Sequence, residues 1–350
     1  MSPGRATPEG TAHFRDAANA AAGHFRRSPD GLTLSSLGIG TYLGRDDAKT
    51  DALYVASVRR ALQLGLNVVD TAINYRNQRS ERAVGAALRE SGQPRDGIVL
   101  CSKGGYIAFD GERPHDARAY IEETLLRPRI LEPGEIVAGC HSVAPRFLAD
   151  QIERSRRNLG ADCIDIYYLH NPETQLGEVP RADFLRRLRL AFQELERACD
   201  DGRIACYGTA TWNGYRVGPD DAEHLSLSEV LEAARDVAGS AHGFRAIQLP
   251  FNIEMDEAAT FRNQGGVTLL EAARAAGLMV FASASLLQGR LTRQLPQTAR
   301  EALRGVDTDA QRALQLVRST PGITCALVGM KTLAHVEENS AVARVEPLSQ

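Results

Sequence analysis

VASVRRALQLGLNVVD (residues 55–70) contains a pattern that recurs along most of the chain. Val55, Val58 and Leu62 follow one another at intervals of three and four residues, so they lie on one face of a helix. Gly65 can end that helix in the left-handed conformation, and the apolar run after it is typical of a buried strand. The stretch therefore predicts a helix followed directly by a strand.

The same order of segments returns further along the chain: RSRRNLG precedes ADCIDIYYLH, RACDDG precedes RIACYGT, AARAAG precedes LMVFAS, and RSTPG precedes ITCALVG. Such alternation is typical of parallel strands joined by crossover helices. Strands are expected at residues 36–40, 67–70, 98–102, 164–169, 204–208, 246–249, 279–282 and 325–328. Eight strands over roughly 300 residues predict an α/β protein, a single-domain (βα)8 TIM barrel with long loops on the active-site side.

A doubly wound dinucleotide-binding sheet is the main alternative fold. It needs a GxGxxG turn directly after an early strand and at the start of a helix. The chain offers only LGIGTYLG at residues 37–44, which lacks that spacing and leads into the charged RDDAKTD. The barrel is therefore the preferred fold.

The chain is expected to divide at about residue 30. Residues 1–30 show neither a helical nor a strand period, and we expect a loosely ordered N-terminal extension there. Residues 31–350 are expected to form the barrel, with an insertion at about 104–141 that is longer than ordinary βα connections. The insertion carries Tyr106, Phe109 and Tyr120, and it either shapes a substrate pocket or is a decorative or oligomer-forming excursion.

Composition excludes several classes of partner and compartment. The 350 residues are 43% hydrophobic and 24% charged, with a net charge of -3, so we expect no general attraction to nucleic acid or to anionic membranes. The six cysteines show no CxxC spacing and are interpreted as reduced, buried residues. Neither a signal sequence nor a bilayer-spanning run is recognisable, so a cytoplasmic protein is expected. Nothing in the sequence indicates the oligomeric state.

Polar residues follow or finish several of the expected apolar strands. They are Asp70, Lys103, His170, Gln248 and Ser283. Because the chemistry of a (βα)8 barrel is built at the carboxyl ends of its strands, these side chains should converge on one mouth. A carboxylate such as Asp70 at the end of a hydrophobic strand also needs a partner, since burying an unpaired charge is costly.

Three of these strand ends lie in motifs that resemble the aldo-keto reductase family. The motifs are DTAINY, CSKGG and IDIYYLHNP, and the segments LGIGTY and IQLPFN are also similar, so that the resemblance runs from about residue 34 to residue 345. It implies that Tyr75 is the general acid, that Asp70 and Lys103 are its ion-paired neighbours, and that His170 orients a substrate carbonyl.

The proposed chemistry is also sensible for these residue types alone. Tyrosine ordinarily loses its proton near pH 10, so a cation that favours the phenolate, such as Lys103, makes it a better acid. Taken singly, each residue has an ordinary explanation: Asp70 as a helix N-cap, Tyr75 as a half-buried ring, Lys103 as a surface cation and His170 as a turn ligand. Four such residues in order at strand ends favour the catalytic interpretation.

The resemblance further implies a nicotinamide dinucleotide held across the barrel mouth without a Gly-rich loop, with NADPH favoured and NADH as the alternative. The residues implied to bind it, besides Asp70, are Gly40, Thr41, Tyr42, Thr211, Gln248, Ser283, Ser285, Leu286, Gln288, Gly289, Lys331, His335 and Asn339. Gln248 corresponds to the residue that bonds the nicotinamide amide, and the backbone from Ser285 to Gly289 to the loop around the pyrophosphate.

This sequence departs from the family pattern at three places. Ala210 and Thr211 replace the usual Ser-Asn after the fifth strand, and Ser283 stands where an aromatic residue commonly stacks on the nicotinamide, although Trp212 or Tyr42 can compensate. Gly329 and Met330 replace the Lys and Ser that often hold the 2′-phosphate, which leaves Lys331 and His335 as candidates.

The sequence therefore predicts an NADP-dependent oxidoreductase that transfers a hydride between the nicotinamide and a small-molecule carbonyl or alcohol. Two rival interpretations are weighed against it. One is a catalytically weak or inactive cofactor-binding barrel that acts as a redox sensor or binds a partner. The other is a metal-dependent hydrolase, which is disfavoured because the strand ends show no second His or HxH pair, so no metal site is expected.

Overall fold

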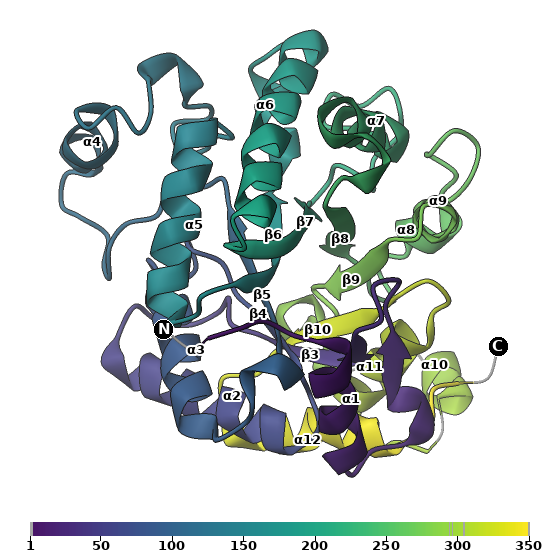
Figure 1. Ribbon diagram of the computed structural model, residues 1–350. Coiled ribbons are helices and arrows are strands. Elements are labelled where there is room, and N and C mark those ends of the chain that lie inside the picture. Colours follow the sequence, from purple (N-terminus) through teal and green to yellow (C-terminus); the bar gives the residue numbers. More distant parts are fainter. Residues whose placement is uncertain (1–2, 294, 296, 304, 349–350) are drawn as a thin grey trace.

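A closed barrel of parallel strands forms the centre of the computed structural model, which describes residues 3–293, 295, 297–303 and 305–348. Around the barrel the strands follow the order β10-β3-β4-β5-β6-β7-β8-β9 (Figure 1). Their bounds are Leu37–Gly40 (β3), Val68–Asp70 (β4), Val99–Gly104 (β5), Ile164–His170 (β6), Ile204–Ala210 (β7), Phe244–Pro250 (β8), Met279–Ser283 (β9) and Cys325–Gly329 (β10). The predicted (βα)8 fold is confirmed, and each expected strand overlaps an observed one.

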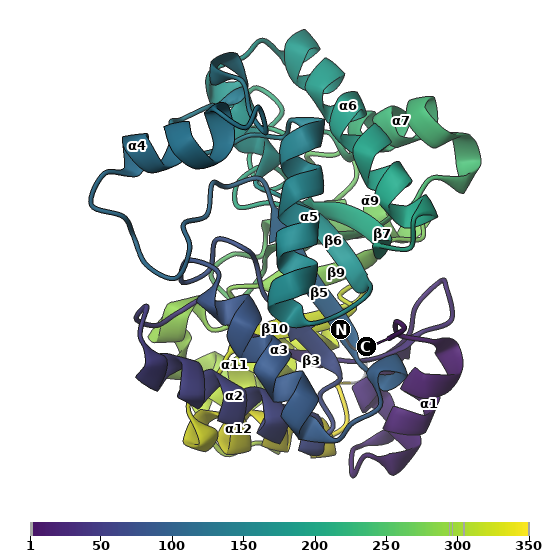
Figure 2. The ribbon, with the colours of Figure 1, turned by 60° about the vertical axis from the view of Figure 1, so that its left-hand side comes forward.

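Helices surround the barrel, as Figures 1 and 2 show. The described ones in the barrel are α2 (Ala48–Gln63), α3 (Arg79–Ser91), α5 (Pro145–Leu159), α6 (Arg181–Asp200), α7 (Leu227–Ala238), α8 (Glu257–Thr260), α9 (Leu269–Ala275), α10 (Gln297–Ala302), α11 (Asp309–Ser319) and α12 (Leu333–Ser340). They bury apolar faces against the outside of the strands, as Val58 and Leu62 of α2 do. The carboxyl ends of the strands are thereby left free for loops.

Helix α2 illustrates how local sequence sets an element. Asp47 caps it, because its carboxylate accepts a hydrogen bond from the Thr50 backbone N–H at 2.7 Å. In the barrel wall, Gly208 allows β7 and β8 to approach closely, since a Cβ there would lie 1.8 Å from the Ala246 carbonyl oxygen. Capping and close packing together hold the strands and helices in register.

The N-terminal segment differs from the loosely ordered extension that we expected. Residues Pro8–Ala17 form helix α1, whose N-cap Thr7 accepts a hydrogen bond from the Gly10 N–H at 2.9 Å. Phe14 on this helix is buried, and β1 (Phe25–Arg27) pairs antiparallel with β2 (Thr33–Ser35). The expected loose order is therefore wrong for these elements. A helix with so few apolar residues is stabilised by tertiary contacts, which cannot be predicted from its own sequence.

The insertion between β5 and α5 contains the short helix α4 (Ala117–Ile121), which lies beside α5 and away from the barrel axis in Figures 1 and 2. A separate apolar cluster of Ile107, Leu125 and Leu131 packs there against Phe147 of α5. An isolated bridge between Tyr106 and His141 closes the base of the insertion. The segment is therefore packed onto the barrel rather than extended from it.

Two further sequence expectations concern membranes and cysteines. Among the described residues, no helix combines the length and apolar character needed to cross a bilayer. All six cysteines are free, as expected, but Cys140 is exposed in the insertion and Cys199 and Cys206 are half-buried, so the prediction that they are buried holds only for Cys101, Cys163 and Cys325. Cys140 is exposed because the end of the insertion lies outside the apolar clusters.

Candidate active site

An ion pair between Asp70 and Lys103 lies at the carboxyl ends of neighbouring strands β4 and β5. Lys103 Nζ is 2.7 Å from Asp70 Oδ2 and donates a second hydrogen bond to the Thr71 carbonyl oxygen at 2.8 Å. Burial alone lowers the pKa of Lys103, but the Asp70 carboxylate and Tyr75 raise it above its ordinary value. The lysine is therefore charged, and the strand-end aspartate has the partner that its burial requires.

Tyr75 lies against this pair on the turn after β4. Lys103 Nζ is 4.9 Å from the centroid of the Tyr75 ring, and the ring of Tyr42 meets it edge-on at 5.0 Å. Burial raises the pKa of the Tyr75 phenol, and the Lys103 ammonium opposes that rise without reversing it. The expected net lowering of this pKa is therefore not found, because desolvation of the phenolate outweighs the nearby cation.

His170, at the end of β6, is the next member of the cluster. Its ring packs edge-on against Tyr75 at 5.8 Å and against Tyr106 of the insertion at 5.2 Å. Burial, the Lys103 charge and His141 together hold the pKa of His170 well below its ordinary value, so the imidazole is neutral at neutral pH. Its Nδ1 is buried and has no hydrogen-bond partner. A neutral ring with an unused polar atom is suited to bonding a ligand.

Residues implied to bind the nicotinamide lie beside the same aspartate. Gln248 Nε2 donates to Asp70 Oδ1 at 2.9 Å, and Thr41 Oγ1 donates to the Asp70 carbonyl oxygen at 3.2 Å. Thr211 is tied to β8 because its N–H donates to the Gln248 carbonyl oxygen at 2.8 Å, while its buried hydroxyl has no partner. Residues from β3, β4, β5, β7 and β8 thus meet at one mouth, as the strand-end pattern predicted.

The remaining residues implied to bind the cofactor lie at the ends of β3 and β9, in the turn after β9, and in the segment from β10 into α12. Ser283 ends β9, Ser285 and Leu286 are buried just beyond it, and Gln288 and Gly289 are exposed. The backbone is left-handed at Leu287, Gln288 and Gly289, with φ of 45°, 53° and 92°, and the N–H groups of Leu287 and Gly289 donate to the carbonyl oxygens of Ala284 and Leu286 at 2.7 and 2.8 Å. Gly40 is half-buried at the end of β3, Lys331 and His335 are exposed, and Asn339 in α12 is buried with Oδ1 unpartnered.

The departures from the family pattern also have a structural counterpart. Ser283 is half-buried at the strand end, and the two aromatic residues that can compensate are exposed, Tyr42 at 55% and Trp212 at 43%. Tyr42 already packs on Tyr75, whereas no aromatic contact of Trp212 is found among the described residues. Met330 is fully buried and Gly329 is exposed, so neither offers a charged group to a phosphate.

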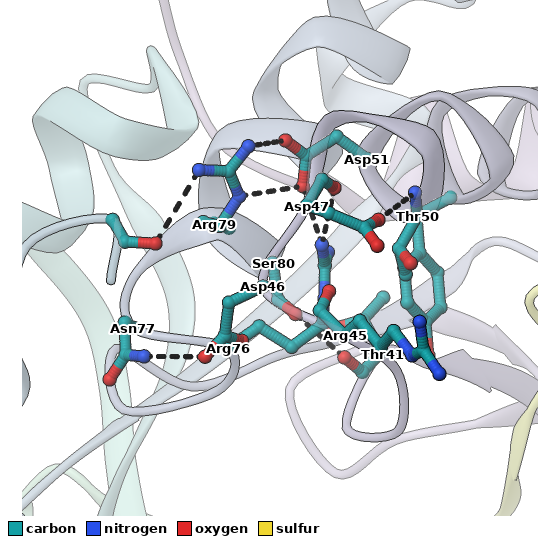
Figure 3. Close-up of polar contacts among 12 residues, drawn as sticks. Thr41, Arg45, Asp46, Asp47, Thr50, Asp51, Arg76, Asn77, Arg79 and Ser80 are labelled. Carbon is teal, nitrogen blue, oxygen red and sulfur yellow. Dashed lines mark hydrogen bonds and ion pairs between the residues drawn. The ribbon is translucent and has the colours of Figure 1, made fainter. Parts of the chain in front are cut away.

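Two buried side chains at the mouth were missed by sequence reasoning. Glu173 Oε1 accepts the backbone N–H groups of Trp212, Asn213 and Gly214 at 2.6, 3.1 and 3.3 Å. Arg76 joins the turn after Tyr75 to the loop after β3 (Figure 3). Their partners lie 25 to 41 residues away in sequence, so no local spacing signals either contact. In the described part of the chain, no three His, Cys, Asp or Glu side chains are placed to share a metal ion.

Comparison with known proteins identifies one protein family and similar oxidoreductases. The model of the Aldo/keto reductase family matches residues 36–350. An uncharacterised oxidoreductase of Schizosaccharomyces pombe is 24% identical over 308 residues, which cover 87% of this chain and 78% of the relative.

Solved structures agree in fold. An aldo/keto reductase from Klebsiella pneumoniae in complex with NADP and acetate superposes with a TM-score of 0.64 at 22% identity, covering 93% of this chain and 91% of that one. The glycerol dehydrogenase of Gluconobacter oxydans reaches a TM-score of 0.63 at 20% identity, covering 92% and 90%.

Proposed function

Because the chain belongs to the Aldo/keto reductase family, we propose that it is an NADPH-dependent oxidoreductase that interconverts a carbonyl compound and its alcohol, with Tyr75 as the general acid and base. One observation carries this proposal: a charged lysine, anchored by a buried carboxylate at 2.7 Å, lies 4.9 Å from the centroid of a tyrosine ring at the mouth of the barrel. Small neutral carbonyl compounds and alcohols are the substrate class that this chemistry suits.

The residues at the mouth fit a nicotinamide dinucleotide. The hydroxyl of Thr211 and the Oδ1 of Asn339 are buried without partners, and a bound polar molecule is an ordinary reason for such atoms. Gln248 and Thr211 would hold the nicotinamide amide, the turn from Ser285 to Gly289 the pyrophosphate, and Lys331, His335 and Asn339 the adenosine side. When bound, NADPH supplies the hydride.

Tyr75 and Lys103 would carry the proton chemistry. In the reducing direction the Tyr75 hydroxyl gives its proton to the carbonyl oxygen as the alkoxide forms, and Lys103 stabilises the phenolate that remains. Asp70 keeps the ammonium charged and in place through the 2.7 Å contact. In the oxidising direction the same phenolate accepts the proton of the alcohol.

His170 would orient the substrate. A neutral imidazole carries one N–H, and it donates this hydrogen to the carbonyl oxygen without adding charge to a site that already holds Lys103. The packing of Tyr75 and Tyr106 on the ring, at 5.8 and 5.2 Å between centroids, fixes the direction of that donor.

The test begins with fluorescence titrations of the purified chain with NADPH and NADH, followed by a panel of aldehydes and ketones with the tighter cofactor. Tyr75→Phe should bind NADPH within about threefold of wild type and lose turnover by about 10²- to 10⁴-fold, the contribution of a positioned acid. Tyr167→Phe is the matched control, since this tyrosine of β6 packs in the core between the strands and the helices. Unchanged turnover in Tyr75→Phe would rule out this proton donor.

The non-catalytic alternative is separated by the same experiment. A redox-sensing or partner-binding barrel binds the nucleotide but transfers no hydride to any member of the panel.

We propose the cytoplasm as the compartment, supported by the six free cysteines.

A further inference from the structure

Three consecutive residues after Tyr75 adopt a backbone conformation that L-amino acids avoid. Arg76, Asn77 and Gln78 have φ of 49°, 51° and 70°, and none of them is glycine. A left-handed conformation strains any residue other than glycine, and such strain persists only where surrounding contacts over-determine it. Asn77 is the residue type best suited to this region, so the strain falls mainly on its two neighbours.

The side chains of this turn are anchored to two parts of the mouth, the loop after β3 and the insertion. Asn77 Nδ2 donates to Asp46 Oδ2 at 2.6 Å, and Gln78 Nε2 donates to the Phe109 carbonyl oxygen in the insertion at 2.9 Å. Arg76 makes the largest set of contacts, and its side chain is only 1% exposed. The turn is therefore held from both sides, by the loop after β3, as Figure 3 shows for Asn77 and Asp46, and by the insertion.

The Arg76 side chain binds backbone carbonyls of the loop after β3 and the Asp51 carboxylate in the first turn of α2. Its Nε donates to the Arg45 carbonyl oxygen at 2.8 Å, and its Nη2 donates to the Asp47 carbonyl oxygen at 3.2 Å and pairs with Asp51 Oδ1 at 2.6 Å. Its guanidinium carbon lies 5.5 Å from the centroid of the Tyr54 ring. Planar donors in a fork can satisfy two carbonyls and a carboxylate at once, which a lysine cannot do in the same geometry.

Arg76 joins two segments that each carry part of the site. One is the loop after β3, and the other is the turn to which Arg76 itself belongs. The loop starts at Thr41 and Tyr42, and the turn starts at Tyr75, whose ring meets Tyr42 at 5.0 Å. Ser80 Oγ adds a hydrogen bond to the Thr41 carbonyl oxygen at 2.7 Å at the start of α3. We propose that Arg76 is a positioning residue that fixes the hydroxyl of Tyr75 relative to Lys103 and to the cofactor-side wall formed by Thr41 and Tyr42.

This inference rests on the proposed function of Tyr75 as proton donor, and its consequence is specific. A displacement of about 1 Å in a reacting group can lower turnover by about 10²-fold without changing how substrates bind. Loss of the Arg76 contacts should therefore act on kcat and on the pH profile of kcat, and only weakly on cofactor affinity.

Arg76→Gly is the principal variant, because it removes the whole side chain and glycine adopts the left-handed conformation without strain. We expect kcat to fall by about 10- to 100-fold, the NADPH dissociation constant to stay within about threefold, and the alkaline limb of the kcat profile to move. Arg76→Lys should recover only part of the loss.

Arg79→Ala is the matched control. Arg79 pairs with the same Asp51, at 2.6 Å, but binds neither Arg45 nor Asp47, so its loss should leave kcat within about twofold. If Arg76→Gly does not fold, Asp51→Asn replaces it, since any loss beyond that of Arg79→Ala then reports the Arg76 contact. Equal kcat and pH profiles in Arg76→Gly and wild type would overturn the proposal, even if the melting temperature falls.

A second readout is independent of turnover. In protein labelled with fluorotyrosine, the resonance of Tyr75 is assigned by its absence in Tyr75→Phe, and it should shift or broaden in Arg76→Gly but not in Arg79→Ala. An inactive wild-type protein would refute the proposed reaction, whereas an unchanged Tyr75 resonance in Arg76→Gly would refute the positioning role of Arg76.

Discussion

The barrel contains two buried Asp–cation pairs of equal length at opposite ends. Asp70 and Lys103 are 2.7 Å apart at the mouth, and Asp165 and Arg95 are 2.7 Å apart at the closed end, near the start of β6. Exposure does not separate them, because the side chains are at most 6% exposed in the first pair and at most 8% in the second. Distance and burial therefore do not distinguish the two pairs.

The neighbours of each pair make the difference. At the closed end, Asp165 also accepts the N–H groups of Ala6 and Leu100 at 2.7 Å each, and Arg95 donates to the carbonyls of Ile98 and Cys163 at 2.6 and 2.9 Å. These contacts tie the N-terminal segment to the floor of the barrel. At the mouth, the pair is surrounded by a tyrosine ring and by polar atoms without partners on His170 and Thr211. At the closed end the hydrogen bonds join neighbouring segments, and Arg95 Nε is left buried without a partner. At the mouth the unpartnered atoms belong to His170 and Thr211 at the strand ends, where a bound ligand could use them.

The largest effect that separates the two ends is expected from Lys103→Met. Removal of the cation beside Tyr75 raises the free energy of the phenolate, so turnover should fall by about 10²-fold or more in steady-state assays. Arg95→Met is the mirror-image variant and should keep wild-type kcat per folded molecule. Comparable losses of kcat in both variants would contradict the prediction that only the pair at the mouth takes part in turnover.

The next effect concerns stability and is expected from Asp165→Ala. Removing one partner of a buried pair leaves the other charge uncompensated, at a cost of about 3–5 kcal/mol in the free energy of unfolding. Urea denaturation followed by circular dichroism measures this loss, with kcat determined on the folded fraction as the control. A cost below about 1 kcal/mol would show that Asp165 is not needed to close the floor.

A pH dependence of stability is expected from His24 at the floor. Burial lowers its pKa to about 4, whereas the unfolded chain has the ordinary value of 6.5. Between these values the unfolded state binds the proton first, so stability rises from about pH 4 to 6.5 and is lost as the pH falls through this range. His24→Asn should flatten this dependence by about 2–3 kcal/mol in urea titrations at several pH values.

The last expected effect is a pH dependence of stability caused by Glu173 at the mouth, and its sign is opposite to that of His24. Burial raises the pKa of Glu173 to about 7 against the hydrogen bonds from Trp212, Gly214 and Asn213, so the folded state holds the proton more tightly than the unfolded one. Stability should therefore fall as the pH rises from about 4.5 to 7. Glu173→Gln should be more stable than wild type at pH 8 by about 2–3 kcal/mol and within about 1 kcal/mol of it at pH 5. A stability difference that does not change with pH would contradict the assignment.

Sequence reasoning performed differently for strands, for catalytic candidates and for supporting residues. Five of the eight strands were predicted because an apolar run follows a helical segment and a glycine, a signal confined to about twenty residues. The convergence of Asp70, Lys103 and Gln248 followed from the rule that strand ends meet at one mouth. Helix α1 was missed, since Phe14 is its only large buried hydrophobic side chain.

The net direction of the Tyr75 pKa was also predicted incorrectly. The Lys103 cation was foreseen from the spacing of the motifs, but the desolvation that outweighs it depends on how completely neighbouring elements cover the phenol. Arg76 and Glu173 escaped notice for a related reason, because each acts on a segment that only the folded chain brings near.

The order of apolar runs, glycines and strand-end polar residues was enough to specify a (βα)8 barrel and the identity of the residues at its mouth. That a second buried ion pair of equal length lies at the floor, how strongly each group is desolvated, and which arginine holds the turn after Tyr75 were decided only by the tertiary structure. The physical reason is range: periodicity and turn chemistry act over a few residues, whereas burial and hydrogen bonding between loops depend on segments separated by tens of residues.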